Sequence, residues 1–373
     1  MTVILKAHGP ADLLAMAPPM VGFLPRNSVV LVAFRGKRTC GAMRFDLPAS
    51  GDRVVHKRVV TTIVGMFCKL PAVDAAVVIV YTDDEFGGGD AIPQADFADV
   101  IGRRLQLSGF EVRESICQAA DGWASYFDSD VPVGGHPLAL IAESTVARAI
   151  ADQRGLFPTP ATMTDRVPRA EKSQRSRMSK RLAAYQNLVT GLDEQDGNSP
   201  PGVLTVLGDI PIFAEGALAW DAAALDAEGA LLVFALQGPP VRDLVMLQWA
   251  FGLEAGDRLW ERDPREGPFD GPDDADLANL MIGIGPRPDP HRIEGALALM
   301  LELTSRTEDV NRPPLLCMLA WLNWALGHGT QAGLHLDEAL AIAPTYSMAQ
   351  LLESMMCTGV MPEWAFERAA RPN

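Results

Sequence analysis

The sequence has few cysteines and none of the spacings that structural zinc sites use. Its five cysteines lie far apart along 373 residues and contain no C-x-x-C pair: Cys40, Cys68, Cys117, Cys317 and Cys357. A disulfide framework or a structural zinc site is therefore not expected. We expect buried, reduced thiols, as in proteins of a reducing compartment.

Long apolar runs are also missing. No stretch approaches the ~18 consecutive apolar residues that a membrane helix needs. The opening MTVILKAHGPADLL lacks the basic start and the apolar core of a signal peptide. We therefore expect a cytoplasmic protein that does not associate with a membrane. Hydrophobic residues make up 48% of the chain, which is enough for a sizeable core.

Common catalytic signatures are absent as well. The sequence contains no G-x-S-x-G nucleophile motif, and the glycines at 87–89 do not fit the G-x-G-x-x-G or G-K-[ST] nucleotide patterns. His328 and His335 are seven residues apart, which is not the i, i+4 spacing of a helical metal pair, and we expect surface or capping roles for both. We assign no catalytic residue, no metal ligand and no cofactor.

Positive charge is scarce except in one segment. The chain has 32 Lys and Arg against 47 Asp and Glu, a formal net charge of -15, so on average it repels phosphate backbones. Residues 166–181 are the exception, and their cations are Arg166, Arg169, Lys172, Arg175, Arg177, Lys180 and Arg181.

This basic segment has three interpretations. Arg175, Arg177, Lys180 and Arg181 are candidates for contact with a nucleic acid or with an acidic protein partner. A solvated helix that faces the protein's own acidic surface is the third. The segment holds no aromatic residue for base stacking, so nucleic acid is the least favoured of the three.

A second candidate site follows an apolar run in the stretch VIVYTDDEFGGGD, residues 78–90. The run 75–82 is typical of a strand that is covered on both faces. Asp83 and Asp84 come directly after it, where ligands bind in open parallel sheets. Together with the glycines they could hold a divalent metal or an anion, and a solvated turn is the alternative. Trp123 and Tyr126 are candidates to line the same pocket, although a hairpin core also suits them.

The first 160 residues alternate between strand and helix patterns. SVVLVAFRGKRTCGAMRFDLP predicts two strands around a turn. Helical spacing follows over 53–70, and a strand, a helix near 97–105 and a strand at FEVRESI form a crossover unit. Asp121-Gly122 predicts a hairpin, and the first helix is expected to break at Pro18-Pro19. We predict an α/β domain over 1–160 with a mixed, partly parallel sheet.

Beyond residue 160 we predict a basic helical connector over 161–198 and an all-α domain over 199–373. That domain ends in a helical hairpin at 313–343, for which Pro313-Pro314 suits the first turn and Gly327 the break. The hairpin resembles a tetratricopeptide repeat at Leu319, Ala320, Ala332, Leu336, Ala339 and Pro344. One repeat cannot bury its own face, so we expect it to pack on its own domain, and a peptide-binding groove is the alternative.

Several phrases together resemble an uncharacterised actinobacterial family, domain-of-unknown-function family 4192. They include ADLLAMAPPMVGFLPRNSVVLVAF, VVIVYTDD, GWASYF and the tail from PPLLCMLAWLNW to GVMPEW. Members show a Gly-Phe-x-Pro-x-x-Ser step before a strand, which matches Gly22, Phe23, Pro25 and Ser28. They also carry two aromatics before Ser-Tyr, where this chain has Trp123 and Ala124. The resemblance implies a cytosolic protein with an α/β front half, and it implies no activity.

Taken together, these patterns favour a non-catalytic protein-interaction or scaffold protein with a protein partner. One alternative is a small-ligand, nucleotide or divalent-metal-dependent enzyme or binding role at the strand ends, with Asp83, Asp84, Trp123 and Tyr126. The other is nucleic-acid binding through the basic connector, with Arg175, Arg177, Lys180 and Arg181.

Overall fold

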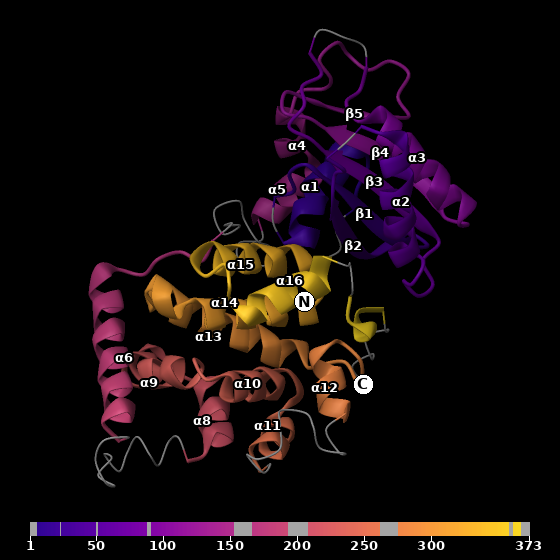
Figure 1. Cartoon of the computed structure of the whole chain (residues 1–373). Coiled ribbons are helices and arrows are strands. Elements are labelled where there is room, and N and C mark those ends of the chain that lie inside the picture. The colour runs from indigo at the N-terminus through magenta and orange to yellow at the C-terminus, as the bar shows by residue number, and fades with distance from the viewer. Residues whose placement is uncertain are drawn as a thin grey trace. The chain divides into compact units, whose positions relative to one another are not determined.

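The computed structural model describes residues 6–22, 24–49, 51–87, 91–152, 166–192, 208–261, 275–357 and 361–366. The chain forms two compact units, one within residues 1–164 and the other over Asp165–Glu367. The first holds strands and helices, and the second is helical throughout its described part (Figure 1). The predicted combination of an α/β front half and an all-α rear half is confirmed.

The sheet of the first unit has the strand order β2-β1-β3-β4-β5. Only β3 and β4 are parallel among these neighbours, and the other pairs are antiparallel. The predicted mixed sheet, the crossover unit and the hairpin after β4 are thereby confirmed. The strands are β1 (Ser28–Arg35), β2 (Arg38–Asp46), β3 (Ala75–Tyr81), β4 (Glu111–Gln118) and β5 (Trp123–Ser125).

Strand β3 lies at the centre of the sheet because all seven of its side chains are apolar enough to be buried. Successive side chains point to opposite faces. Val78 and Val80 pack with helices α2 and α3 on one face, and Val77 and Ile79 pack with α1 on the other. The helices of this unit are α1 (Pro10–Val21), α2 (Arg53–Phe67), α3 (Ala95–Leu107), α4 (Ala139–Ala142) and α5 (Thr145–Asp152).

Helix α1 does not break at Pro18-Pro19, so that prediction is wrong. The helix continues to Val21, and Gly22, with φ 84°, ends it by donating its N–H to the carbonyl of Pro18 at 2.9 Å. Both prolines therefore lie in the last turns. Leu14 and Ala17 are buried against the sheet, and this packing outweighs the helix hydrogen bonds that the prolines cannot donate.

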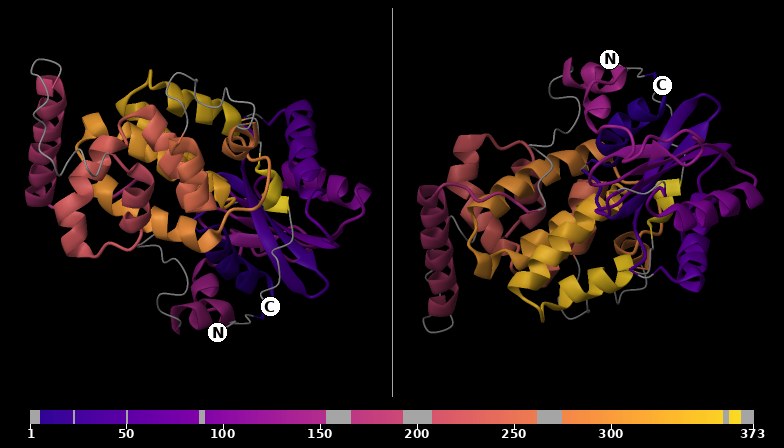
Figure 2. Two further views of the ribbon diagram at one scale, coloured as in Figure 1. Left: turned by 90° about the horizontal axis from the view of Figure 1, so that it is seen from below. Right: turned by 90° about the horizontal axis from the view of Figure 1, so that it is seen from above.

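The second unit is a set of helices around one apolar core. They are α6 (Lys172–Leu192), α8 (Ile210–Ala217), α9 (Ala222–Ala235), α10 (Pro239–Phe251), α11 (Leu253–Trp260), α12 (Ala275–Met281), α13 (Pro290–Arg306), α14 (Pro313–Ala325), α15 (Gly329–Ile342) and α16 (Ser347–Cys357), with 3-10 turns η1 (Asp309–Asn311) and η2 (Glu363–Phe366). Helix α6 lies at the edge of this unit in all views of Figures 1 and 2.

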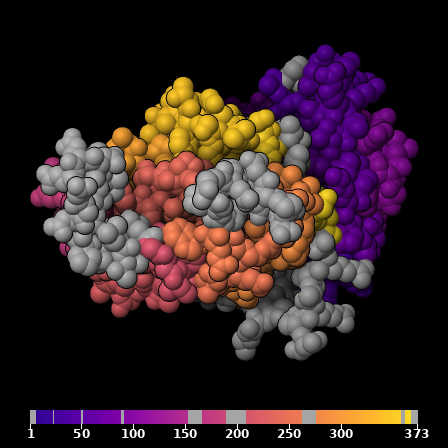
Figure 3. Space-filling view, turned by 60° about the horizontal axis from the view of Figure 1, so that its bottom comes forward, coloured from indigo at the N-terminus to yellow at the C-terminus, as the bar shows by residue number. Residues whose placement is uncertain are grey.

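Helices α14 and α15 form the hairpin predicted over 313–343. Pro313 and Pro314 occupy the first turn of α14, and Gly327, with φ 85°, separates it from α15. Every residue of α14 is buried, because α10, α13, α15 and α16 all pack against it. Residues nearer the C-terminus reach the surface of the unit, as the yellow area of Figure 3 shows. Helix α14 therefore presents no open groove of its own.

The cysteines depart in part from expectation. Cys117 and Cys317 are buried, but Cys40 and Cys68 are exposed, and all four are free thiols. Cys40 lies on β2, a strand at the edge of the sheet, and Cys68 follows the end of α2. The side chain of Cys357 lies outside the described residues. The expectation of uniformly buried thiols is therefore wrong, whereas the four described cysteines form no disulfide.

Candidate functional site

The two aspartates after β3 point to different partners. Asp83 Oδ2 accepts a hydrogen bond from Asn27 Nδ2 at 2.5 Å, and the Asp83 N–H donates to Asn27 Oδ1 at 3.0 Å. Asp84 Oδ2 accepts from Thr82 Oγ1 at 2.9 Å and from Gln94 Nε2 at 2.7 Å. Each carboxylate is thus engaged by neutral donors of its own unit, which fix the chain on either side of the strand end.

These bonds hold two residues in an uncommon backbone conformation. Asn27 and Gln94 are non-glycine residues with positive φ, 40° and 60°. Such conformations persist where the surroundings over-determine them. The side chains of Asp83 and Asp84 supply part of that constraint, so the strand end is a built turn and not a loose one. Gly88, Gly89 and Asp90 lie outside the described residues.

The loop after Asp84 packs against the β4–β5 hairpin. The Phe86 N–H donates to Asp121 Oδ1 at 2.9 Å, and the Ala120 N–H donates to the Asp84 carbonyl at 3.0 Å. The Phe86 ring is buried in a small cluster with Cys117, Ala119 and Ala124. Residues 84–86, which follow β3, are therefore a packed part of this unit.

Trp123 and Tyr126 do not face one cavity. Trp123 packs with the α1 face of the sheet, and its Nε1 donates to the Pro137 carbonyl at 3.2 Å. Tyr126 packs on the opposite face, and its hydroxyl donates to the Pro93 carbonyl at 2.7 Å. Burial raises the pKa of Tyr126 well above its usual range, and it raises the pKa of the adjacent Cys117 to about 12. Both aromatic side chains thus have structural partners.

The candidate residues of the strand end are not gathered into a metal-binding group. Within the described residues, no set of three or more His, Cys, Asp or Glu side chains is placed to hold a metal ion. The carboxylates of Asp83 and Asp84 also diverge, as expected for consecutive residues that leave a strand. Of the four residues predicted here, Asp84 and Tyr126 contact the segment at Pro93 and Gln94, whereas Asp83 bonds to Asn27 and Trp123 packs on the α1 face.

The basic residues predicted near 175 lie on helix α6. This helix carries five cations and no acidic residue: Lys172, Arg175, Arg177, Lys180 and Arg181. Met178 and Leu182 are buried against the core, and Tyr185 packs beside Phe234 on α9 with 5.9 Å between ring centroids. The apolar side of α6 is thereby anchored, and Lys172, Arg177, Lys180 and Arg181 are exposed.

Three of the four predicted contact residues meet acceptors of their own unit. Arg175 Nη1 lies 3.1 Å from Glu308 Oε2, and Arg177 Nη2 lies 3.6 Å from Asp226 Oδ2. Arg181 donates to the carbonyls of Asp226 and Ala227 on α9. Lys180 is exposed. The basic helix therefore faces acidic groups of the same unit along one side.

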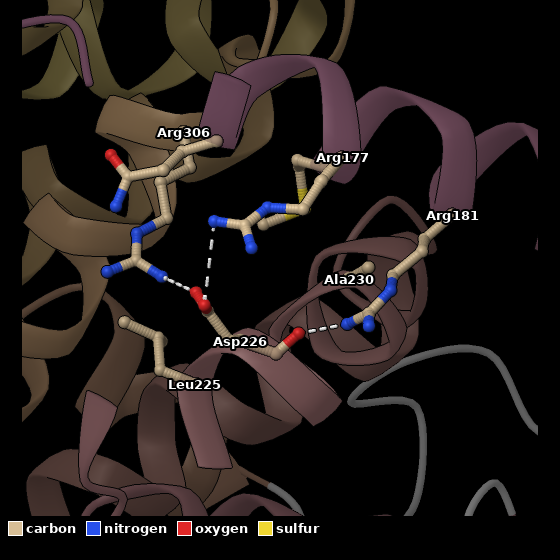
Figure 4. A pocket seen from close by; sticks show the side chains of 8 residues that line it. Arg177, Arg181, Leu225, Asp226, Ala230 and Arg306 are labelled. Atoms are coloured by element: carbon tan, nitrogen blue, oxygen red, sulfur yellow. Dashed lines mark hydrogen bonds and ion pairs between the residues drawn. The ribbon is translucent and has the colours of Figure 1, made fainter. Parts of the chain in front are cut away.

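A small pocket lies among α6, α9 and α13 (Figure 4). Its volume is about 50 Å³, and it is lined by Gln174, Arg177, Met178, Arg181, Leu225, Asp226, Ala230 and Arg306. Figure 4 shows Arg177 and Arg306 directed at the carboxylate of Asp226 from two sides. The Arg306 Nη1 to Asp226 Oδ1 distance is 2.6 Å. The pocket is therefore an arginine cluster built around one carboxylate.

Sequence reasoning identified α6 but missed Asp226 and Arg306. They are distant from α6 along the chain, and they lie on two separate helices, α9 and α13. The available signal was weak: Arg306 is the basic residue in the last turn of α13, where the helix dipole favours a cation. Only the packing of α6 on α9 and α13 brings the side chains of Arg177, Asp226 and Arg306 together.

A second polar cluster of this unit is fully buried. Arg312 is 1% exposed and lies 3.0 Å from Glu338 on α15, and its Nη2 donates to the Val167 carbonyl at 3.3 Å. His335 is 7% exposed, so the expectation of a surface or capping role is wrong for it. Its burial, together with the charge of Arg312, lowers its pKa to about 4. This cluster ties the segment before α6 to α14 and α15.

Helices long and apolar enough to cross a bilayer do not occur in the described part of the chain. A family model described as Domain of unknown function (DUF4192) matches residues 10–363. Neither the comparison with curated proteins nor the comparison with solved structures found a match. The matched range runs from the first residue of α1 to the turn η2, so it includes the strand-end loop and the arginine pocket.

Proposed function

The chain belongs to the DUF4192 family, and from that premise we propose that it is a non-catalytic protein-interaction or scaffold protein. Its helical unit binds an acidic segment of a partner protein along helix α6. The carrying observation is the segregation of charge: five cations and no acidic residue on one exposed helix, in a chain with a net charge of -15. Such a stripe attracts a partner of opposite sign and steers its approach.

The anchoring of α6 supports a docking role. Its apolar side chains are held in the core, and the preceding segment is tied down by the Ala170 N–H, which donates to the Ser305 carbonyl at 2.9 Å. A partner would therefore meet a preformed helix, and it would not have to order one. Preorganisation of this kind reduces the entropy lost on binding.

Nucleic-acid binding through the same helix is the weaker candidate. Arg175 and Arg181 already contact acceptors of their own unit at hydrogen-bond distance. Each phosphate contact by these arginines would compete with such an acceptor, so less binding energy remains for a nucleic acid. By contrast, the carboxylates of an acidic protein segment can pair with the exposed side chains of Lys172, Arg177 and Lys180.

A ligand site at the strand ends is also weaker. The carboxylates of Asp83 and Asp84 accept hydrogen bonds from Asn27, Thr82 and Gln94. A metal ion there would have to displace those donors, and an anion would meet two carboxylates. We further propose a cytoplasmic location, since the four described cysteines are free thiols.

The experiment uses the full chain and a poly-glutamate peptide as a model acidic segment, with a duplex DNA of similar charge as a second probe. We expect salt-sensitive binding of poly-glutamate that weakens in the double variant Lys172→Gln, Lys180→Gln. The matched control is Lys57→Gln, Arg58→Gln, which removes two exposed cations from α2. Preferential binding of DNA would move the assignment to nucleic acid. No binding of either probe, or equal weakening in both double variants, would refute docking on α6.

A further inference from the structure

The pocket among α6, α9 and α13 contains more positive charge than its own carboxylate balances. Arg177, Arg181 and Arg306 line it, and Asp226 is the acidic residue of the lining. Glu302, one turn before Arg306 on α13, pairs with Arg306 Nη2 at 3.2 Å from outside the lining. Even with Glu302 counted, the positive charge exceeds the negative charge. In a chain that is strongly acidic overall, this local excess is favourable for an anion.

One arginine of the lining retains hydrogen-bonding capacity that points to a ligand. Arg306 is already engaged on both sides, because its Nη1 donates to Asp226 at 2.6 Å and its Nη2 donates to Glu302 at 3.2 Å. The Arg177 guanidinium has five N–H donors, and its contact with Asp226, at 3.6 Å, is longer than a hydrogen bond.

The size of the pocket limits what it can enclose. Its volume is about 50 Å³, and one water molecule requires roughly 10–15 Å³ on this measure. The space therefore holds about three to five water molecules, which is close to one small oxyanion and far below a nucleoside. Whatever carries the anion must extend from the pocket into solvent.

We propose that this pocket binds one phosphate group, with the Arg177 guanidinium as its donor and the positive charge of Arg306 beside it. Guanidinium groups bind phosphate oxygens through paired, charge-assisted hydrogen bonds, and a phosphate ester carries about -1.5 to -2 charges at neutral pH. Within the lining alone, three arginines against Asp226 leave two positive charges, which one phosphate group balances and a single carboxylate does not. The identity of the carrier, a phosphorylated segment of the partner protein, rests on the proposed function. Binding of the anion itself does not.

Asp226 and Arg181 have separate parts in this site. Asp226 holds the side chains of Arg177 and Arg306 together when no anion is present. Its negative charge opposes the incoming phosphate. Arg181 donates to the carbonyls of Asp226 and Ala227, so it positions the turn of α9 that carries Asp226. Removal of the Asp226 charge should therefore strengthen phosphate binding, whereas removal of the Arg177 charge should weaken it.

In the test, the full chain is titrated with inorganic phosphate at constant ionic strength, and calorimetry measures the heat of binding. We expect one site per chain. Arg177→Gln, at a side chain that is 61% exposed, should weaken binding about tenfold, as expected for loss of charge-assisted hydrogen bonds. Asp226→Asn should tighten it about fivefold, because a like charge near the anion is removed. Arg58→Gln, which removes the same charge from an exposed position on α2, should change it less than about twofold.

Absence of saturable phosphate binding by the wild-type chain would overturn the proposal, as would equal weakening in Arg177→Gln and Arg58→Gln. Phosphate binding that fails while poly-glutamate still binds would remove the phosphate site and leave docking on α6 in place. Phosphate binding that succeeds while poly-glutamate does not bind would remove the docking role and leave the anion site.

Discussion

Two charged regions of this molecule invite comparison: the aspartates after β3 and the arginines around Asp226. At the strand end, Asp83 and Asp84 are held by neutral donors from Asn27, Thr82 and Gln94. In the helical unit, Arg177, Arg181 and Arg306 line one pocket with Asp226, and the Arg177 guanidinium lies 3.6 Å from that carboxylate, beyond hydrogen-bond distance. The first region uses its polar groups to shape a turn, and the second retains unused donors.

The difference shows that a dense run of like charge is a poor guide to a site. A polar group that is already paired contributes to folding, and it must lose that pairing before it can bind anything else. A charged group that keeps hydrogen-bond donors in reserve is the more informative feature. By this criterion the conspicuous Asp83-Asp84 pair is structural, and Arg177, whose contact with Asp226 is 3.6 Å long, marks the place where a ligand would gain most.

The largest predicted effect tests whether the loop after β3 is structural. Phe86→Ala removes a ring that is 6% exposed and packs on Cys117, Ala119 and Ala124. We expect a loss of about 3 kcal/mol in the unfolding free energy of the α/β unit. Hydrogen exchange of amides in β3 and β4 measures it. Phe127→Ala is the matched control, because Phe127 is 58% exposed. Equal protection in both variants would mean that the loop is a loose turn.

The second prediction concerns the pH dependence of the helical unit, which contains the buried cluster of Arg312, Glu338 and His335. His335 has a pKa of about 4 in the folded protein, against about 6.5 when unfolded. The unfolded state therefore binds the proton first, and the helical unit should lose up to about 3 kcal/mol as pH falls from 6.5 to 4.

Tryptophan fluorescence during urea unfolding measures this pH effect, because six of the seven tryptophans lie between residues 220 and 364. His335→Leu should flatten the profile between pH 6.5 and 4. His291→Gln is the control, since that imidazole is 92% exposed. An unchanged slope in His335→Leu would contradict the assignment of the effect to His335.

A smaller effect separates the two aspartates from each other. Asp84→Ala leaves the Thr82 hydroxyl and the Gln94 amide without their acceptor, so we expect a loss of about 1–2 kcal/mol in the α/β unit. Asp83→Ala removes one exposed contact to Asn27 and should cost about 0.5 kcal/mol. Hydrogen exchange of β3 ranks the two variants. A gain in stability on removal of either carboxylate would show that the pair is strained by mutual repulsion, as a vacant metal site would be.

Much of the fold was predictable because local patterns and packing agree. The continuous apolar run at Ala75–Tyr81 has enough β-branched side chains to fill both faces of a sheet, and it became the central strand. Pro313 and Gly327 mark the ends of α14 as helix chemistry requires. The prediction at Pro18 was wrong because burial of Leu14 and Ala17 on the sheet outweighs the local penalty of proline.

Only the part of the candidate site that lies on α6 was predictable from the sequence. The cations of α6 lie close together within residues 172–181 and are easy to find, but their meaning depends on Asp226 and Arg306, which other helices supply. No periodicity of α9 or α13 indicates that these two side chains meet α6. The burial of His335 escaped prediction for the same reason, since it depends on the packing of α15 against the segment that leads into α6.

The central claim, that the aspartates are committed to structure while the arginine pocket is open to an anion, is tested most directly by phosphate-induced thermal stabilisation. Wild type, the double variant Asp83→Asn, Asp84→Asn, and Arg177→Gln are melted with and without phosphate at constant ionic strength. A bound anion raises the melting temperature by mass action. We predict the same shift in wild type and in the aspartate variant, and little or no shift in Arg177→Gln. A shift that persists in Arg177→Gln, or that is lost in the aspartate variant, would contradict the claim.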